Sequence, residues 1–163
     1  MIKAIVAVRK GDRGIGFKND LPWRIPSDLK HFKECTKGGT VVMGWNTMLS
    51  LGSKPLPGRR NIVITKFKTT VPEGFENIHV GTQFRDVVHY LEGLYEDVWI
   101  IGGAATYELF MDHIESWVVT VVDAPDVPCD RFLPEIPFQV KAIQKSTPDE
   151  RDEFPYEIYY YQR

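Results

Sequence analysis

An aspartate stands among apolar residues in the stretch "GIGFKNDLPWRIPSDLKHFK", residues 14–33. On a helix, Asp28, Phe32 and Cys35 share one face, because they are spaced at i, i+4 and i+7. A carboxylate on an apolar face is costly unless a cation or several hydrogen-bond donors meet it, so the pattern indicates a ligand with paired donors. The alternative is that Asp28 caps its own helix, and spacing alone slightly favours the cap.

Two junctions could hold phosphate groups. In "WIIGGAATYELF" (99–110), an apolar strand runs into a diglycine turn and then a helix, whose first amides attract anions. "VVMGWNTMLSLG" (41–52) repeats this arrangement with Gly44, followed by Asn46 and Thr47. Together the junctions could cradle a pyrophosphate. The alternatives are a tight turn that binds nothing in the first case, and ordinary helix caps in the second.

A rigid turn precedes two arginines in "KPLPGRRNIVIT" (54–65). Arg59 or Arg60 could form a bidentate pair with a carboxylate, although a solvated charge at a strand end is the better interpretation of either one alone. Thr65 and Lys66 follow, where a hydroxyl and a cation could bind phosphate. The four histidines show no metal-ligand spacing, so we predict no metal.

The elements that position these residues alternate along the chain. Short, continuous apolar segments predict strands buried on both faces, at residues 2–8, 40–44, 60–65 and 97–103. Helical patterns lie between or directly after them, at residues 26–36, 82–94 (with Thr82 as N-cap) and 103–114. Such alternation is typical of βαβ units and a parallel sheet.

The final third is different. Residues 116–125, 138–146 and 156–163 have strand character with no helix between them, which predicts an antiparallel edge on the same sheet. We therefore expect one α/β domain over residues 1–163. Its central sheet is mixed and mostly parallel, with antiparallel C-terminal strands and helices on both faces.

Composition limits the class of protein. A chain of 163 residues with 43% hydrophobic content can bury a core without disulfides or metals. The net charge of −2 gives no electrostatic reason to expect nucleic acid or an anionic membrane as partner. Cys35 and Cys129 lie far apart, as expected of a reduced protein, and the apolar run of residues 4–8 is too short for a signal peptide. We expect a cytoplasmic protein.

Seven stretches occur in a family-specific order: "IVAV", "IGFKNDLPWRIPSDLKHFK", "VVMG", "LPGRRNIVIT", "WIIGGAATYE", "TVVDA" and "FPYEIYYYQR". Over essentially its whole length the chain thus resembles bacterial-type dihydrofolate reductase. The string LPW-x-x-P-x-DL-x-x-F is the most specific of these features. The resemblance implies hydride transfer from NADPH to 7,8-dihydrofolate, which yields 5,6,7,8-tetrahydrofolate for one-carbon and thymidylate metabolism.

The resemblance also implies roles for individual residues around the substrate. Asp28 matches the acid that binds the pterin, Thr120 the hydroxyl that supports this acid, and Trp23 a tryptophan that holds a water. Tyr107 matches a residue near the hydride path, and Arg59 the partner of the substrate's glutamate α-carboxylate. The apolar walls implied for the pterin and aminobenzoyl rings are Ile5, Leu29, Phe32 and Leu51.

For the cofactor, the resemblance implies a nicotinamide pocket, a mobile loop and a pyrophosphate cradle. Their residues are Ala7, Ile15, Gly16, Asn19, Gly44, Asn46, Thr47, Thr65, Lys66, Ile101, Gly102, Gly103 and Ala104. Asp130 best matches the acid that latches the mobile loop. Trp45 and Ala105 stand where relatives often carry arginines near the 2′-phosphate. Lys66 is the remaining candidate, so the preference for NADPH over NADH stays open.

Binding partners follow from the same resemblance. We expect a monomer that binds dihydrofolate and antifolate inhibitors such as trimethoprim and methotrexate. One alternative is a pyrimidine reductase of riboflavin synthesis, which would not need Asp28 and Arg59 in these contexts. Another is a catalytically silent nucleotide-binding module, which predicts a damaged site, whereas the matched residues are present.

Overall fold

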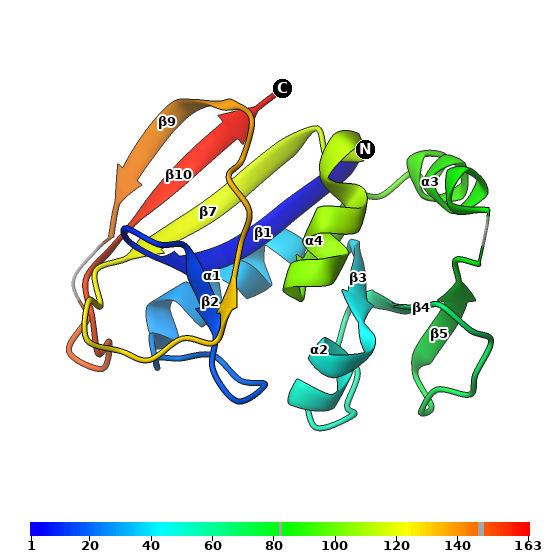
Figure 1. Cartoon of the computed structure of the whole chain (residues 1–163), viewed down its shortest axis with the longest axis horizontal. Coiled ribbons are helices and arrows are strands. Elements are labelled where there is room, and N and C mark those ends of the chain that lie inside the picture. The colour runs from blue at the N-terminus through cyan, green and yellow to red at the C-terminus, as the bar shows by residue number, and fades with distance from the viewer. Residues whose placement is uncertain (82, 147–148) are drawn as a thin grey trace.

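The computed structural model describes residues 1–81, 83–146 and 149–163 (Figure 1). These residues form an eight-stranded sheet in the order β5-β4-β3-β6-β1-β7-β10-β9. Its strands are β1 (Ile2–Arg9), β3 (Thr40–Gly44), β4 (Arg60–Thr65), β5 (Phe75–His79), β6 (Val98–Gly102), β7 (Ser116–Val122), β9 (Gln139–Lys145) and β10 (Tyr156–Gln162). A small second sheet pairs β2 (Gly14–Gly16) with β8 (Arg131–Phe132).

The sheet is mixed and mostly parallel, which confirms the predicted fold class. β1 pairs in parallel with both β6 and β7, while β10 is antiparallel to β7 and to β9. One detail of the prediction is wrong, because β7 was expected in the antiparallel edge. The helical segment before β7 acts as a crossover that returns the chain to the same end of the sheet, so β7 enters parallel to β1.

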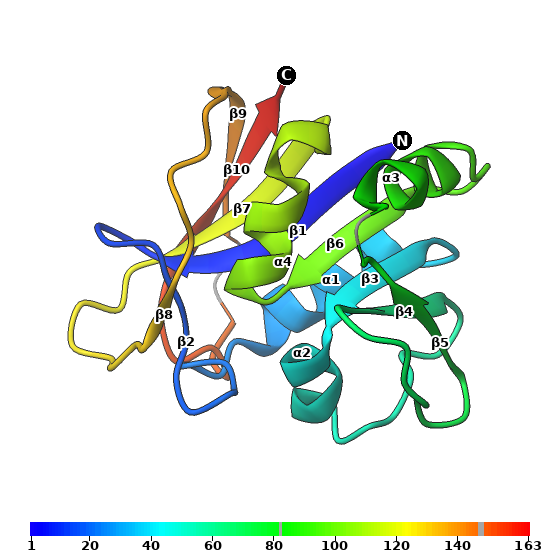
Figure 2. The same ribbon diagram turned by 45° about the vertical axis from the view of Figure 1, so that its right-hand side comes forward.

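Helices cover both faces of the sheet (Figure 2). They are α1 (Pro26–Thr36), α2 (Trp45–Ser50), α3 (Phe84–Glu92) and α4 (Ala104–Phe110), and a 3-10 turn, η1 (Met111–His113), follows α4. Side chains of α3 and α4 join one apolar cluster with Val6, whereas Phe32 and Met48 of α1 and α2 join a second cluster with Ile5. Adjacent residues of β1 therefore serve opposite faces, as the period of two requires.

Local boundaries agree well with the sequence. α1 spans the predicted residues and has a proline in its first turn, where a missing N–H costs nothing. The predicted cap of α3, Thr82, lies outside the described residues. None of the helices within the described ranges has the length and apolar character needed to cross a bilayer.

Candidate active site

Asp28 lies in the first turn of α1, against the sheet. Thr120 Oγ1 of β7 donates a hydrogen bond of 2.7 Å to Asp28 Oδ1. Burial raises the pKa of the Asp28 carboxyl. The hydrogen bond from Thr120 acts in the opposite direction but is the smaller effect, so the pKa is raised overall. Among the described residues, Thr120 is the one hydrogen-bond donor to this carboxylate, which therefore keeps acceptor capacity for a ligand.

Asp28 does not cap its own helix. The residue at the N-cap position of α1 is Ile25, and within the described part of the chain no backbone N–H of α1 donates to the Asp28 side chain. The capping alternative is therefore wrong, and the expected shared face of Asp28, Phe32 and Cys35 is confirmed. Phe32 and Cys35 both pack against the sheet on the side where Thr120 meets Asp28.

The predicted apolar wall residues mostly belong to one cluster, on the side of the sheet that α1 covers. Trp23 and Ile5 are almost fully buried in it, and Phe32 and Leu51 are half-buried against it. Leu29 differs from the other predicted wall residues, because 52% of its surface is exposed. An exposed leucine one residue from a buried carboxylate is suited to covering a bound apolar ring.

Tyr107 links α4 to the centre of the sheet. Its hydroxyl donates to the backbone oxygen of Ile5 at 2.7 Å, and 3% of its surface is exposed. Burial raises the pKa of the Tyr107 phenol strongly, so this group stays protonated and neutral. A Cβ added to Gly102 would lie 3.6 Å from the Tyr107 hydroxyl oxygen, which places the tyrosine directly beside the diglycine turn.

The two glycine junctions lie side by side, as predicted. A Cβ on Gly102 would be 3.4 Å from Thr47 Oγ1, and a Cβ on Gly44 would be 3.9 Å from the Gly103 nitrogen. Gly102 has a φ of +130°, which side-chain-bearing residues rarely adopt. The backbone at Gly44 thus comes close to the backbone of the diglycine turn, and a side chain at these glycines would fill the space between them. This is the kind of cradle that a pyrophosphate requires.

The capping alternative for Asn46 and Thr47 is wrong. α2 begins at Trp45 with Gly44 as its N-cap residue, so both polar residues lie inside the helix. Ala104 opens α4 in the same way after Gly103. Among the described residues, neither helix has a side-chain hydrogen bond at its N-cap, so no protein side chain satisfies these first-turn amides from that position.

The two adjacent arginines have different partners. Arg60 forms a forked salt bridge with Glu76, at 2.5 and 2.9 Å. Arg59 instead donates Nε to the Pro57 oxygen at 3.0 Å and Nη1 to Thr36 Oγ1 at 2.9 Å. A guanidinium carries five N–H donors, so these two bonds orient Arg59 and leave donors for a ligand carboxylate. The structure therefore favours Arg59 over Arg60 as the carboxylate-binding residue.

Thr65 and Lys66 lie at the end of β4, near the Gly44 junction. β4 pairs with β3 so that Ile64 stands opposite Gly44. The Thr65 hydroxyl donates to the Phe67 oxygen at 2.5 Å and accepts from Asn77 at 2.9 Å, whereas Lys66 is exposed. The Thr65 hydroxyl is thus held by the protein, and the Lys66 ammonium can reach a ligand from solvent.

The loop after β1 is held by Asp130. The Asp130 N–H donates to the Gly16 oxygen at 2.8 Å, and the Lys18 N–H donates to Asp130 Oδ2 at 3.0 Å. These bonds match the latch contact that the resemblance implied. Asn19 turns this loop with a φ of +61°. Ile15 packs with the α4 cluster, whereas Ala7 and Ile101, predicted for the same nicotinamide pocket, pack with the cluster on the α1 side.

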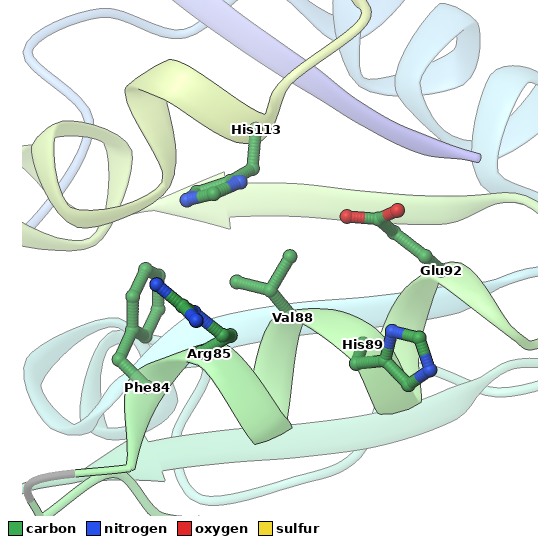
Figure 3. A pocket seen from close by; sticks show the side chains of 6 residues that line it. All are labelled: Phe84, Arg85, Val88, His89, Glu92 and His113. Carbon is green, nitrogen blue, oxygen red and sulfur yellow. The ribbon is translucent and has the colours of Figure 1, made fainter.

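A separate hollow of about 350 Å³ lies between α3 and η1 (Figure 3). The figure shows Val88 and His113 pointing into it from opposite sides. Its lining residues are Phe84, Arg85, Val88, His89, Glu92 and His113. None of them is a predicted site residue, so the chemistry described above lies elsewhere on the molecule.

Comparison with known proteins agrees with this geometry. A family model described as "Dihydrofolate reductase" matches residues 1–163. The chain belongs to the dihydrofolate reductase family. The predicted resemblance is confirmed, and the family match favours it over the pyrimidine reductases that share the fold.

Relatives within the dihydrofolate reductase family are moderately similar. The chain is 35% identical to dihydrofolate reductase of Staphylococcus aureus over 156 residues, covering 94% of this chain and 91% of the relative. It is 33% identical to that of Bacillus subtilis, with coverage of 100% and 95%. Among solved structures, dihydrofolate reductase from Enterococcus faecalis complexed with NADP(H) and RAB-propyl matches with a TM-score of 0.91 and 28% identity, covering 100% of this chain and 96% of the other.

Proposed function

We propose that this protein reduces 7,8-dihydrofolate to 5,6,7,8-tetrahydrofolate with NADPH, acting as a cytoplasmic monomer. The observation that carries the proposal is the largely desolvated Asp28 carboxylate at the start of α1, which receives a hydrogen bond from Thr120. Membership of the dihydrofolate reductase family supports the same activity.

Asp28 binds the pterin in this proposal. Its carboxylate accepts hydrogen bonds from the amino group and the adjacent ring nitrogen, a pair of parallel donors that compensates a buried charge. Thr120 orients the carboxylate from the other side through its 2.7 Å bond. Ile5, Phe32 and Leu51 then exclude water from the ring, because they already belong to one apolar cluster.

When bound, NADPH would supply a hydride to C6 of the pterin's 5,6 imine bond and leave as NADP+, while N5 would take up a proton from water. The glycine cradle of Gly44, Gly102 and Gly103 accepts the pyrophosphate, and Tyr107 fixes the cradle to β1 through its bond to the Ile5 oxygen. Trp23 holds a water close to the pterin, and the loop latched by Asp130 encloses the site. The protein's main contributions are therefore to position the two ligands and to exclude water from the site.

Two cationic side chains select the ligands. Arg59, already oriented by Thr36, pairs with the substrate's glutamate α-carboxylate. Lys66 contacts the 2′-phosphate of NADPH from the end of β4. It takes the role of the arginines that relatives often carry at the positions of Trp45 and Ala105. The same pterin site accepts diaminopyrimidine and diaminopteridine antifolates, whose paired donors suit the Asp28 carboxylate.

The test is the decrease of NADPH absorbance upon addition of dihydrofolate, and its inhibition by methotrexate and trimethoprim. Asp28→Asn is expected to fold normally and to lose most turnover at neutral pH, because a neutral amide cannot pair with two donors. Glu34→Gln removes the same charge from an exposed position of α1 and should leave turnover unchanged. Near-wild-type turnover of Asp28→Asn would reject the assigned role.

A further inference from the structure

The connection between β9 and β10 holds the start of α1 at two points. Residues 149–155 of this connection pass beside the first turn of the helix (Figure 1). The Glu153 N–H donates to the Arg24 oxygen at 3.0 Å, and the Glu153 carboxylate accepts the Arg24 N–H. Asp152 contacts Ser27. The connection therefore binds the chain on both sides of the proline that opens α1.

Asp152 serves as the N-terminal cap of α1 from a distant part of the chain. Ile25 at the N-cap position has no polar side chain, and Pro26 has no N–H. The Ser27 N–H is therefore the first amide donor of the helix, and it donates to Asp152 Oδ1 at 3.0 Å. A carboxylate at this position also interacts favourably with the positive end of the helix dipole.

A hydroxyl chain strengthens this contact. Ser27 Oγ lies 2.5 Å from Asp152 Oδ2 and 2.7 Å from the Tyr156 hydroxyl. Ser27 has one hydroxyl proton, which goes to the carboxylate, so Tyr156 must donate its own proton to Ser27. The chain Tyr156–Ser27–Asp152 thus fixes the first turn of α1 to β10, which lies next to β7 in the sheet.

We propose that Asp152 is a positioning residue for the Asp28 carboxylate. By holding Ser27 through both oxygens, it sets the rotation of the first helical turn and so the approach of Asp28 to Thr120. Its negative charge also acts on Asp28 across the same turn. The predicted loss of activity rests on the proposed function. The predicted effect on the Asp28 carboxyl does not, because the bonds from Ser27 to Asp152 and from Thr120 to Asp28 are present without a ligand.

The charges around Asp28 give the direction of the effect. Burial raises the pKa of the Asp28 carboxyl most strongly, the His31 charge lowers it, and the Asp152 charge raises it. Cys35 on α1 and Tyr156 on β10 also face Asp28, and the Asp28 charge raises the pKa of both groups. Both are neutral near pH 7, so Asp152 is the negative charge whose removal should lower the pKa of Asp28.

Two variants separate geometry from charge. Asp152→Asn keeps an oxygen that can cap the Ser27 N–H but removes the charge. Asp152→Ala removes both, and the first turn of α1 loses its anchor. Glu150→Gln removes one negative charge from an exposed position of the same connection and is the matched control. Thermal unfolding of every variant checks that the chain is folded before other properties are compared.

The experiment combines an NMR titration of the Asp28 carboxyl carbon in the ligand-free protein with the pH profile of kcat/KM for dihydrofolate. We expect the Asp28 midpoint to move to lower pH in Asp152→Asn and to stay in place in Glu150→Gln. For Asp152→Ala we expect a roughly tenfold loss of kcat/KM, because misplaced catalytic groups lose rate steeply.

An unchanged Asp28 midpoint in Asp152→Asn, or an equal shift in Glu150→Gln, would overturn the inference. Full kcat/KM in a folded Asp152→Ala would overturn its geometric part. If the wild-type protein failed to reduce dihydrofolate, the proposed function would fall, and the NMR midpoints would still decide whether Asp152 acts on Asp28.

Discussion

Thr120→Val tests the hydrogen bond that defines the site. The change replaces a hydroxyl by a methyl of similar shape, at a residue with 2% of its surface exposed, so solvent has little room to replace the lost donor. A hydrogen bond to a charged group contributes about 1.5–3 kcal/mol to stability. In a chain of this size, 1 kcal/mol corresponds to about 2–4 °C in Tm, so Tm at neutral pH should fall by roughly 3–12 °C.

The loss should depend on pH. The pKa of the Asp28 carboxyl is raised in the folded protein above its ordinary 3.8, and the Thr120 bond limits this rise. When the pKa of a carboxyl is higher in the folded protein than in the unfolded chain, the unfolded chain releases its proton at lower pH. The free energy of unfolding therefore decreases as the pH rises from the unfolded-state pKa through the folded-state pKa. Removing Thr120 raises this pKa further. The difference in Tm between wild type and variant should therefore be small near pH 4 and widen toward pH 7.

Thr40→Val provides a matched control for this experiment. Thr40 is fully buried and donates to a carboxylate oxygen of Glu96, also at 2.7 Å. The pKa of Glu96 is lowered below its ordinary 4.5, so the stability that Thr40 contributes is complete above about pH 5. Thermal unfolding of the ligand-free proteins by circular dichroism would be compared from pH 4 to pH 7. A Thr120→Val difference that stays constant above about pH 5, like that of Thr40→Val, would refute the reasoning.

Three further substitutions test the ligand contacts. Thr36→Val removes the acceptor that orients Arg59, so KM for dihydrofolate should rise about fivefold with kcat unchanged; an unchanged KM contradicts this role. Lys66→Ala should weaken NADPH more than NADH in initial-rate measurements, and equal losses with both would reject Lys66 as the phosphate contact. Asp130→Ala removes the acceptor of the Lys18 N–H, so the single-turnover hydride rate should fall severalfold, and a full rate would show that the latch is dispensable.

Elements with continuous local patterns were predictable. The strands at residues 40–44 and 60–65 and the helix at residues 26–36 were placed with their observed boundaries, because apolar runs and an initial proline encode them within a few residues. β5, with the sequence FENIH, was missed because polar residues interrupt it. β2 and β8 were missed because they are three and two residues long and exist only by pairing with each other.

The chemistry of the site was predictable in residue type but not always in role. Local spacing slightly favoured a cap for Asp28, whereas the family resemblance implied a pterin-binding acid supported by Thr120. The hydrogen bond from Thr120, 92 residues away, shows where the carboxylate lies. The cap itself comes from Asp152, 125 residues beyond Ser27, and no local signal identifies it. Helix-capping patterns assume partners within one turn, so a cap from another strand connection falls outside them.

The sequence by itself determined the alternation of those strands and helices that have continuous local patterns, the glycines at two junctions and the presence of a carboxylate beside apolar residues. Tertiary structure decided which of two adjacent arginines is paired: Arg60 meets Glu76 of the neighbouring strand, while Arg59 keeps donors for a ligand. It also decided that β7 runs parallel to β1. The physical reason is that backbone propensity acts over a few residues, whereas the environment of a charge depends on whichever distant segments the packed core brings beside it.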